Sequence, residues 1–79
     1  MKIEIRLYAS FRKLFPGDCS AGECYIDVED GTTVNELLIR LRIPPDAPKV
    51  VFLNGVHAGG NELLKEGDRV GAFPPVAGG

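Results

Sequence analysis

The sequence has few of the residues that most often carry chemistry, and no segment suited to cross a membrane. Among 79 residues there is no Trp, one His and two Cys. The apolar runs are far shorter than the roughly 20 residues that span a bilayer. Nine Lys and Arg stand against eleven Asp and Glu and are scattered along the chain, so no surface for nucleic acid or for an anionic membrane is indicated.

The length and the first residues set the expected class of protein. A chain of 79 residues is expected to form one domain. Residues 1–6 alternate charged and apolar side chains, unlike the continuous apolar stretch of a signal peptide. We therefore expect a protein of the cytoplasm.

The two cysteines, Cys19 and Cys24, are too few for a metal centre. A structural zinc ion takes four ligands, which two Cys and the single His57 cannot supply. A disulfide between them is geometrically feasible but rare in a reducing compartment. We expect free thiols, with Cys24 pointing inward from a strand.

Motifs of catalysis are missing as well. The sequence has no Gly-rich dinucleotide loop, no Walker loop and no Ser-His-Asp set. His57 stands beside a predicted hairpin turn, where a lone histidine is usually a solvated surface residue. A domain of this size also leaves little room for a deep pocket. We expect that the chain is not an enzyme on its own.

Period-two alternation marks the predicted strands. Residues 2–8 place Ile3, Ile5 and Leu7 on one face, which predicts a half-buried strand. Residues 49–53 are apolar on both faces, which predicts a fully buried strand. The other predicted strands cover residues 24–29, 56–58 and 69–73.

Helical spacing marks one main helix. Thr33 opens it, and Glu36 three residues later completes a capping box. Pro44-Pro45 is expected to end it. Asn54-Gly55 is a strong signal for a two-residue hairpin turn. Two further short helical segments are predicted, over 10–15 and 62–64.

The order of these elements predicts the fold. Two hairpins flank one helix, and the economical packing lays that helix across one face of a mixed sheet of four to five strands. This is the α+β architecture of the ubiquitin-like β-grasp fold, expected over residues 1–74, with a flexible Gly-Gly tail over 75–79. The predicted core consists of Ile3, Ile5, Leu7, Ile26, Val28, Val34, Leu37, Leu38, Leu41, Val51, Leu53, Val70 and Ala72.

The last residues are the strongest candidate for a reactive site. Pro74 and Pro75 cannot donate to a sheet ladder, so they end the last strand and keep the chain extended. The five residues beyond Pro74 can reach roughly 16–18 Å. Gly78 and Gly79 have no side chains and can enter a narrow channel. The terminal carboxylate, once adenylated with ATP, becomes a good electrophile that sulfur can attack.

Several stretches of the chain resemble the small, sulfur-carrying subunit of molybdopterin synthase (MoaD type). The closest is the closing run from Glu66-Gly67-Asp68-Arg69-Val70 through Phe73-Pro74-Pro75 to Gly78-Gly79. The opening residues 5–12, the helix start at Thr33 and residues 51–55 also fit. The thiazole sulfur carriers (ThiS type) share the Gly-Gly end but generally lack the Phe-Pro-Pro at 73–75. The segment between Leu14 and Cys24 fits no familiar pattern.

This resemblance implies a mechanism in which partners supply the catalytic side chains. An E1-like adenylating enzyme would use MgATP to activate Gly79, beside Gly78, and a persulfide donor would leave a thiocarboxylate. The tail would then deliver sulfur inside the large synthase subunit, in an expected heterotetramer, to build the molybdenum or tungsten cofactor. The chain itself would bind no cofactor. The implied partner-binding residues are Tyr8, His57, Phe73, Pro74, Pro75 and Val76.

Three other functions fit the same residues. The chain could carry sulfur for another acceptor, in thiazole, cysteine or tRNA thiolation. It could be a protein modifier joined to lysines through Gly79. It could also be a binding domain whose tail is an inert, frayed terminus, although a Gly-Gly end after Pro-Pro is poorly explained by chance.

Overall fold

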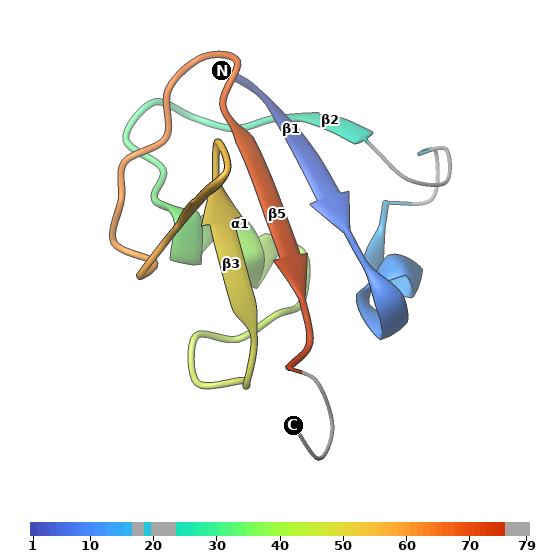
Figure 1. Ribbon diagram of the computed structural model, residues 1–79. Coiled ribbons are helices and arrows are strands. Elements are labelled where there is room, and N and C mark those ends of the chain that lie inside the picture. Colours follow the sequence, from blue (N-terminus) through green and yellow to red (C-terminus); the bar gives the residue numbers. More distant parts are fainter. Residues whose placement is uncertain (17–18, 20–23, 76–79) are drawn as a thin grey trace.

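The computed structural model describes residues 1–16, 19 and 24–75, which form a five-stranded mixed sheet with one α-helix behind it (Figure 1). The strands are β1 (Lys2–Leu7), β2 (Cys24–Asp27), β3 (Val50–Leu53), β4 (Val56–His57) and β5 (Arg69–Phe73). Their order across the sheet is β2-β1-β5-β3-β4. β1 and β5 are parallel neighbours, and the other pairs are antiparallel. The predicted β-grasp architecture is confirmed.

The main helix, α1 (Val34–Arg40), begins at the predicted capping box. The Thr33 hydroxyl oxygen accepts a hydrogen bond from the Glu36 backbone N–H at 3.2 Å, and the Glu36 carboxylate accepts one from the Thr33 N–H at 2.9 Å. These two bonds satisfy donors that the first helical turn leaves free. Val34, Leu37 and Leu38 then face the sheet and are buried.

The helix ends before the two prolines rather than at them. Arg42 adopts a left-handed conformation with φ of 68°. Its N–H donates to the Ile39 carbonyl, and the Ile43 N–H donates to the Leu38 carbonyl. This is a Schellman ending, in which the residue after the turn usually packs against the helix. Ile43 accordingly joins the core, a role that the sequence pattern did not predict.

The hairpin between β3 and β4 turns at Asn54-Gly55, as predicted. Both residues have positive φ, 53° and 84°, as a type I′ turn requires. The turn is also tied to β5. The Asn54 N–H donates to the Arg69 carbonyl at 2.8 Å, and the Asn54 side-chain oxygen accepts from the Arg69 N–H at 2.9 Å.

The core lies between α1 and the sheet and consists largely of the predicted residues. Of these, only Ile26 and Leu53 are partly rather than fully buried, and both still pack against the core. Besides Ile43, the structure adds Ala58 and Leu64 to the predicted core, and also Cys24, which was predicted to point inward but was not named among the core residues.

Two predicted elements differ in the structure. Residues 62–64 form no helical turn, because Leu63 makes an isolated β-bridge with Thr33 and the Leu64 N–H donates to the Thr32 carbonyl. The strand over 49–53 is buried on one face only. The predicted short helix is present as the 3₁₀ helix η1 (Ala9–Leu14).

The expectation of free thiols is wrong. Cys19 and Cys24 are joined by a disulfide. Their Cα atoms lie 5.3 Å apart, within the distance that a disulfide spans. The sequence shows two cysteines five positions apart but not whether their Cα atoms lie close enough to be joined. Cys24 does point inward, as predicted, and is 6% exposed.

Candidate functional site

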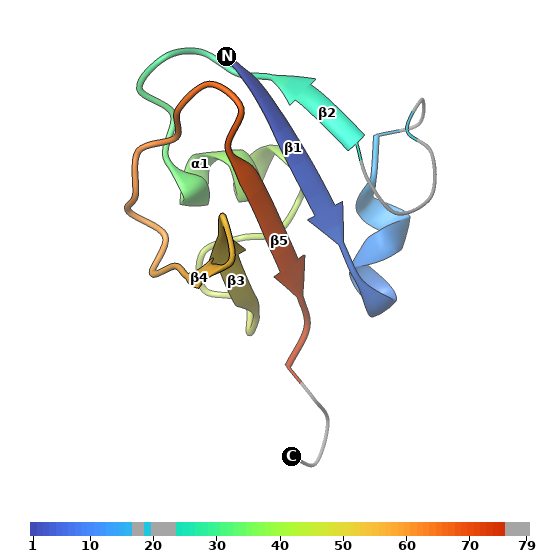
Figure 2. The same cartoon turned by 45° about the horizontal axis from the view of Figure 1, so that its top comes forward.

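One face of the sheet is left uncovered by α1. Figure 2 shows the helix behind the sheet and no helix in front of β1 and β5. Along β5, Val70 and Ala72 are buried on the helix side, so Gly71 and Phe73 lie on the open face. Register places Arg6 of β1 beside Gly71 on one side and Phe52 of β3 on the other. The open face is therefore built around β5, the strand that leads to the tail.

Four rings form a continuous row across this face. The Tyr8 and Phe73 rings meet edge to face, with centroids 5.9 Å apart. Phe73 stacks on Phe52 at 5.8 Å, with only 20° between the ring planes. Phe52 in turn meets the His57 ring edge to face at 5.9 Å. These are the separations that aromatic pairs favour. We call Tyr8, Phe73, Phe52 and His57 the aromatic row.

The structure thus brings together the three predicted patch residues Tyr8, His57 and Phe73. Tyr8 is 43% exposed, Phe73 half-buried and His57 exposed. His57 does not contact Phe73 directly; Phe52 joins them. The role of these residues in partner binding stays a prediction.

Phe52 is the residue that sequence reasoning missed. The sequence pattern predicts a fully buried strand here, but Phe52 is half-buried on the open face. The predicted hairpin turn does carry information about the face on which Phe52 lies. A two-residue loop at Asn54-Gly55 pairs Phe52 with His57, as observed, and directly paired residues share a face of the sheet. The expected exposure of His57 would have placed Phe52 outside as well.

The centre of the open face is hollow. Gly71 has no side chain, and its neighbours surround a depression of about 660 Å³. We call it the Gly71 hollow. It is lined by Arg6, Tyr8, Ala9, Phe52, Gly55, Arg69, Gly71, Phe73 and Pro74.

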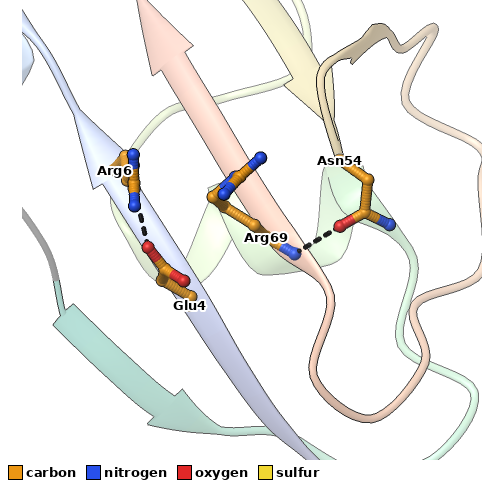
Figure 3. A network of polar contacts seen from close by, with 4 residues as sticks. All are labelled: Glu4, Arg6, Asn54 and Arg69. Atoms are coloured by element: carbon orange, nitrogen blue, oxygen red, sulfur yellow. Dashed lines mark hydrogen bonds and ion pairs between the residues drawn. The ribbon is translucent and has the colours of Figure 1, made fainter.

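Two arginines and one glutamate lie on the side of the hollow away from Pro74. The Arg6 Nε donates to the Glu4 carboxylate at 2.6 Å, as Figure 3 shows. Arg69 pairs with Glu4 in the strand register and therefore stands on the same face. Its backbone is held by Asn54, while its side chain is exposed. Among the described residues, the Arg6 and Arg69 guanidinium groups thus share this face with the Glu4 carboxylate.

A carboxylate with a perturbed pKa lies near the His57 end of the aromatic row. The Glu62 carboxylate accepts hydrogen bonds from the Gly59 N–H at 2.8 Å and the Gly60 N–H at 2.7 Å. The Gly59 N–H, then the N–H of Glu62 itself and of Gly60, lower the pKa of Glu62 below its ordinary value of 4.5, and His57 adds a smaller lowering. These bonds hold the loop that follows β4.

The tail begins directly at the open face. Pro74, half-buried at the edge of the hollow, and the exposed Pro75 continue from Phe73. The predicted tail residues Val76, Gly78 and Gly79 lie outside the described residues. Phe73 of the aromatic row and Pro74 at the start of the tail are therefore consecutive along the chain.

Two absences concern metals and membranes. Within residues 1–16, 19 and 24–75, no three His, Cys, Asp or Glu side chains are grouped so that they could hold a metal ion. No helix in this described part of the chain is both long and apolar enough to cross a membrane.

The fold and its open face define a ubiquitin-like β-grasp protein. The chain belongs to the ThiS family, whose model matches residues 5–79. No curated protein sequence matches it significantly. The resemblance to carriers of the MoaD and ThiS types is confirmed at the level of the family.

Three solved structures are similar over nearly the whole chain. A putative molybdopterin converting factor subunit 1 from Pyrococcus furiosus is 28% identical, with 95% of this chain and 98% of that chain covered and a TM-score of 0.73. The small archaeal modifier protein 1 of H. volcanii is 24% identical, with coverages of 95% and 98% and a TM-score of 0.73. A complex of subunits 1 and 2 of the molybdopterin-converting factor from Helicobacter pylori contains a chain 24% identical, with full coverage of both chains and a TM-score of 0.64.

Proposed function

We propose that this chain is a sulfur carrier that works in molybdopterin biosynthesis through the carboxylate of Gly79. The observation that supports this most strongly is that Phe73, in the middle of the aromatic row, ends β5 and leads directly into Pro74 and Pro75. From there the sequence runs to Gly78-Gly79. A partner that covers this face is placed to receive the tail.

The reaction proceeds by activation and exchange. An E1-like enzyme joins the Gly79 carboxylate to AMP from MgATP and releases pyrophosphate. The terminal sulfur of a persulfide donor attacks the acyl carbon, and AMP leaves. A thiol reductant then cleaves the sulfur–sulfur bond, which frees a thiocarboxylate on Gly79 and returns the donor as a thiol. The thiocarboxylate transfers its sulfur in the large synthase subunit.

This chain contributes a binding surface and a tail long enough to enter an active site. The partners contribute the catalytic side chains and bind the nucleotide. Exposed aromatic side chains are favoured anchors of interfaces. The small Gly-Gly end suits an enclosed active site, because backbone without side chains needs little room. The Helicobacter pylori relative is in a complex with a second subunit, which supports a synthase-like partner for this chain.

The Pyrococcus furiosus relative supports the molybdopterin assignment over other sulfur acceptors. The name of the H. volcanii relative favours one alternative, a modifier that is joined to other proteins. Both functions begin with adenylation of Gly79 and differ in the nucleophile that follows, a persulfide in one and a lysine amine in the other.

Intact mass spectrometry separates these functions. The chain is incubated with the adenylating enzyme, MgATP and a persulfide donor, with ATP omitted as the control. A carrier gains one sulfur in exchange for one oxygen, and the change maps to the terminal peptide. If the chain reacts with its partners but sulfur never appears at Gly79, the carrier function is wrong. Isopeptide conjugates through Gly79 would establish the modifier function instead.

A further inference from the structure

Gly71 is not required by the backbone or by the packing of the sheet. Its φ is not in the left-handed region. A Cβ atom added to it would lie 3.7 Å from the Tyr8 ring and 3.9 Å from the Arg6 carbonyl oxygen, which is ordinary contact. Glycine inside a strand weakens that strand, and it often marks a place where another molecule approaches closely. The Gly71 hollow is therefore open at a cost in stability that the fold itself does not explain.

The side chains around Gly71 give the hollow two chemically different sides. Phe52 and Phe73 form an apolar side, stacked on each other at 5.8 Å. Arg6 and Arg69 form a cationic side. An apolar side chain fits against the two phenylalanine rings, and an anion fits beside the arginines.

On the cationic side, Arg69 differs from Arg6 in its carboxylate partners. Glu4 is the carboxylate nearest to both arginines in the strand register, and it accepts a hydrogen bond from Arg6. The neighbouring Asp68 carboxylate accepts instead from the Asn54 amide and from the Lys65 N–H. Within the described residues, the Arg69 guanidinium therefore has no carboxylate of its own. Guanidinium groups pair with carboxylates in a bidentate geometry.

We propose that the Gly71 hollow is a specificity pocket for a partner protein, in a role that rests on the carrier function proposed above. It receives one apolar side chain of the partner, and Arg69, assisted by Arg6, pairs with an Asp or Glu next to that side chain. The aromatic row supplies general apolar contact. The hollow selects partners that present an apolar residue beside an acidic one.

Variants at two positions test the proposal in the full-length chain. The partners are the large synthase subunit and the adenylating enzyme from the same organism, and the affinity of each is measured by titration calorimetry. Gly71→Leu fills the hollow and should weaken binding of at least one partner about tenfold or more, because hot-spot contacts lie in closed pockets. Gly71→Ala should weaken it less and should preserve or raise the melting temperature, because alanine stabilises a strand relative to glycine.

Charge reversal tests the cationic side. Arg69→Glu should weaken the same partner about tenfold or more and remove part of the salt dependence of binding. Arg69→Lys keeps the charge but loses the bidentate geometry, so it should weaken binding less than Arg69→Glu does. Lys65→Glu makes the same change of charge in the exposed loop before β5 and should alter affinity less than about twofold. A photo-cross-linking residue at position 8 should label a partner peptide with an apolar residue next to Asp or Glu. Replacing that acid with Arg should restore binding to the Arg69→Glu variant.

The outcomes separate this proposal from the carrier function. If Gly71→Leu and Arg69→Glu fold and bind both partners as the wild type does, the specificity pocket is wrong, while sulfur at Gly79 would still establish the carrier. If binding responds as expected but sulfur never reaches Gly79, the pocket stands and the carrier function fails. If neither partner binds the wild type, or if the hollow instead joins two copies of this chain in sedimentation experiments, the proposal is overturned.

Discussion

At the scale of single residues, Phe73 links the open face to the tail. Its ring lies between those of Tyr8 and Phe52, and Pro74 follows it directly. Replacing Phe73 with Ala should weaken binding to the large synthase subunit by about 1–3 kcal/mol, because a central aromatic anchor is lost. The free energy of unfolding should fall by about 1 kcal/mol for the lost ring contacts.

Calorimetric titration and urea unfolding measure these two changes for Phe73→Ala. Tyr25→Ala is the matched control, since Tyr25 is an aromatic residue 58% exposed on the edge strand β2, which β1 separates from β5. It should bind as the wild type does. A Phe73→Ala chain that unfolds, yet binds with unchanged affinity per folded molecule, would show that Phe73 is a structural residue only.

Glu62 gives a second prediction at this scale, one that depends on pH. Its folded-state pKa lies below the ordinary value of 4.5 because the Gly59 and Gly60 N–H groups favour the charged carboxylate. A lowered pKa contributes stability that is fully present above the unfolded-state pKa and is lost as pH falls through the folded-state pKa.

Glu62→Gln should therefore destabilise the domain at pH 7, and its difference from the wild type should shrink as pH falls below about 4.5. Urea unfolding at pH 7 and pH 3 measures both. Glu29→Gln, with an exposed carboxylate before the turn that precedes α1, is the control and should change little at either pH. A difference for Glu62→Gln that is constant or grows toward pH 3 would contradict the assignment.

At the scale of elements, the sequence predicts those features that depend on residues close together in the chain. The capping box at Thr33 and the turn at Asn54-Gly55 depend on residues a few positions apart, so both were recognised. The helical turn predicted over 62–64 is wrong because the backbone of Leu63 pairs with Thr33, thirty positions earlier in the chain. A tertiary bridge of this kind leaves no periodic signal.

In the candidate site, too, features set within one strand could be predicted, and features set by the pairing of several strands could not. Tyr8 and Phe73 could be predicted to lie on the outward face because alternation along each of their strands determines the face of each residue. The Gly71 hollow could not, since it exists only where Arg6 and Phe52 flank Gly71 in the observed register of three strands.

The disulfide gives a prediction for the segment between η1 and β2. Cys19 and Cys24 are five positions apart, so the closed loop is short. In the chain-entropy description, such a loop contributes about 2 kcal/mol to the free energy of unfolding. The double variant Cys19→Ser, Cys24→Ala should lose about this much, and it should keep sulfur transfer because the reacting group is at Gly79.

Thermal unfolding of the wild type with and without a reductant provides the matched control, since reduction removes the same cross-link without a mutation. Both changes should lower stability to a similar extent. A double variant that folds but no longer transfers sulfur would mean that a persulfide passes through the cysteines of this chain.

At the scale of the whole molecule, the sheet determines how far the tail can reach. β5 ends at Phe73, and the residues from Pro74 to Gly79 must carry the carboxylate from the open face into a partner's active site. An extended residue adds roughly 3.3–3.6 Å. Removing Gly79, or adding one residue after it, therefore displaces the reacting carbon by about that distance.

Such a displacement is large compared with the precision that catalysis requires. Reacting atoms must meet at about 3–3.5 Å, and an error of about 1 Å can cost 10²-fold in rate. Both length variants should lower sulfur transfer at least about 100-fold, with an unchanged melting temperature and unchanged binding through the aromatic row. Gly78→Val should also impair transfer, since it keeps the length but adds bulk in the channel, whereas Ala77→Gly keeps length and adds none. Single-turnover assays of thiocarboxylate formation and of its consumption by the large subunit measure each step. If the chain without Gly79 still carries and delivers sulfur at the wild-type rate, the reacting group lies elsewhere, and the binding surface described here would serve a different function.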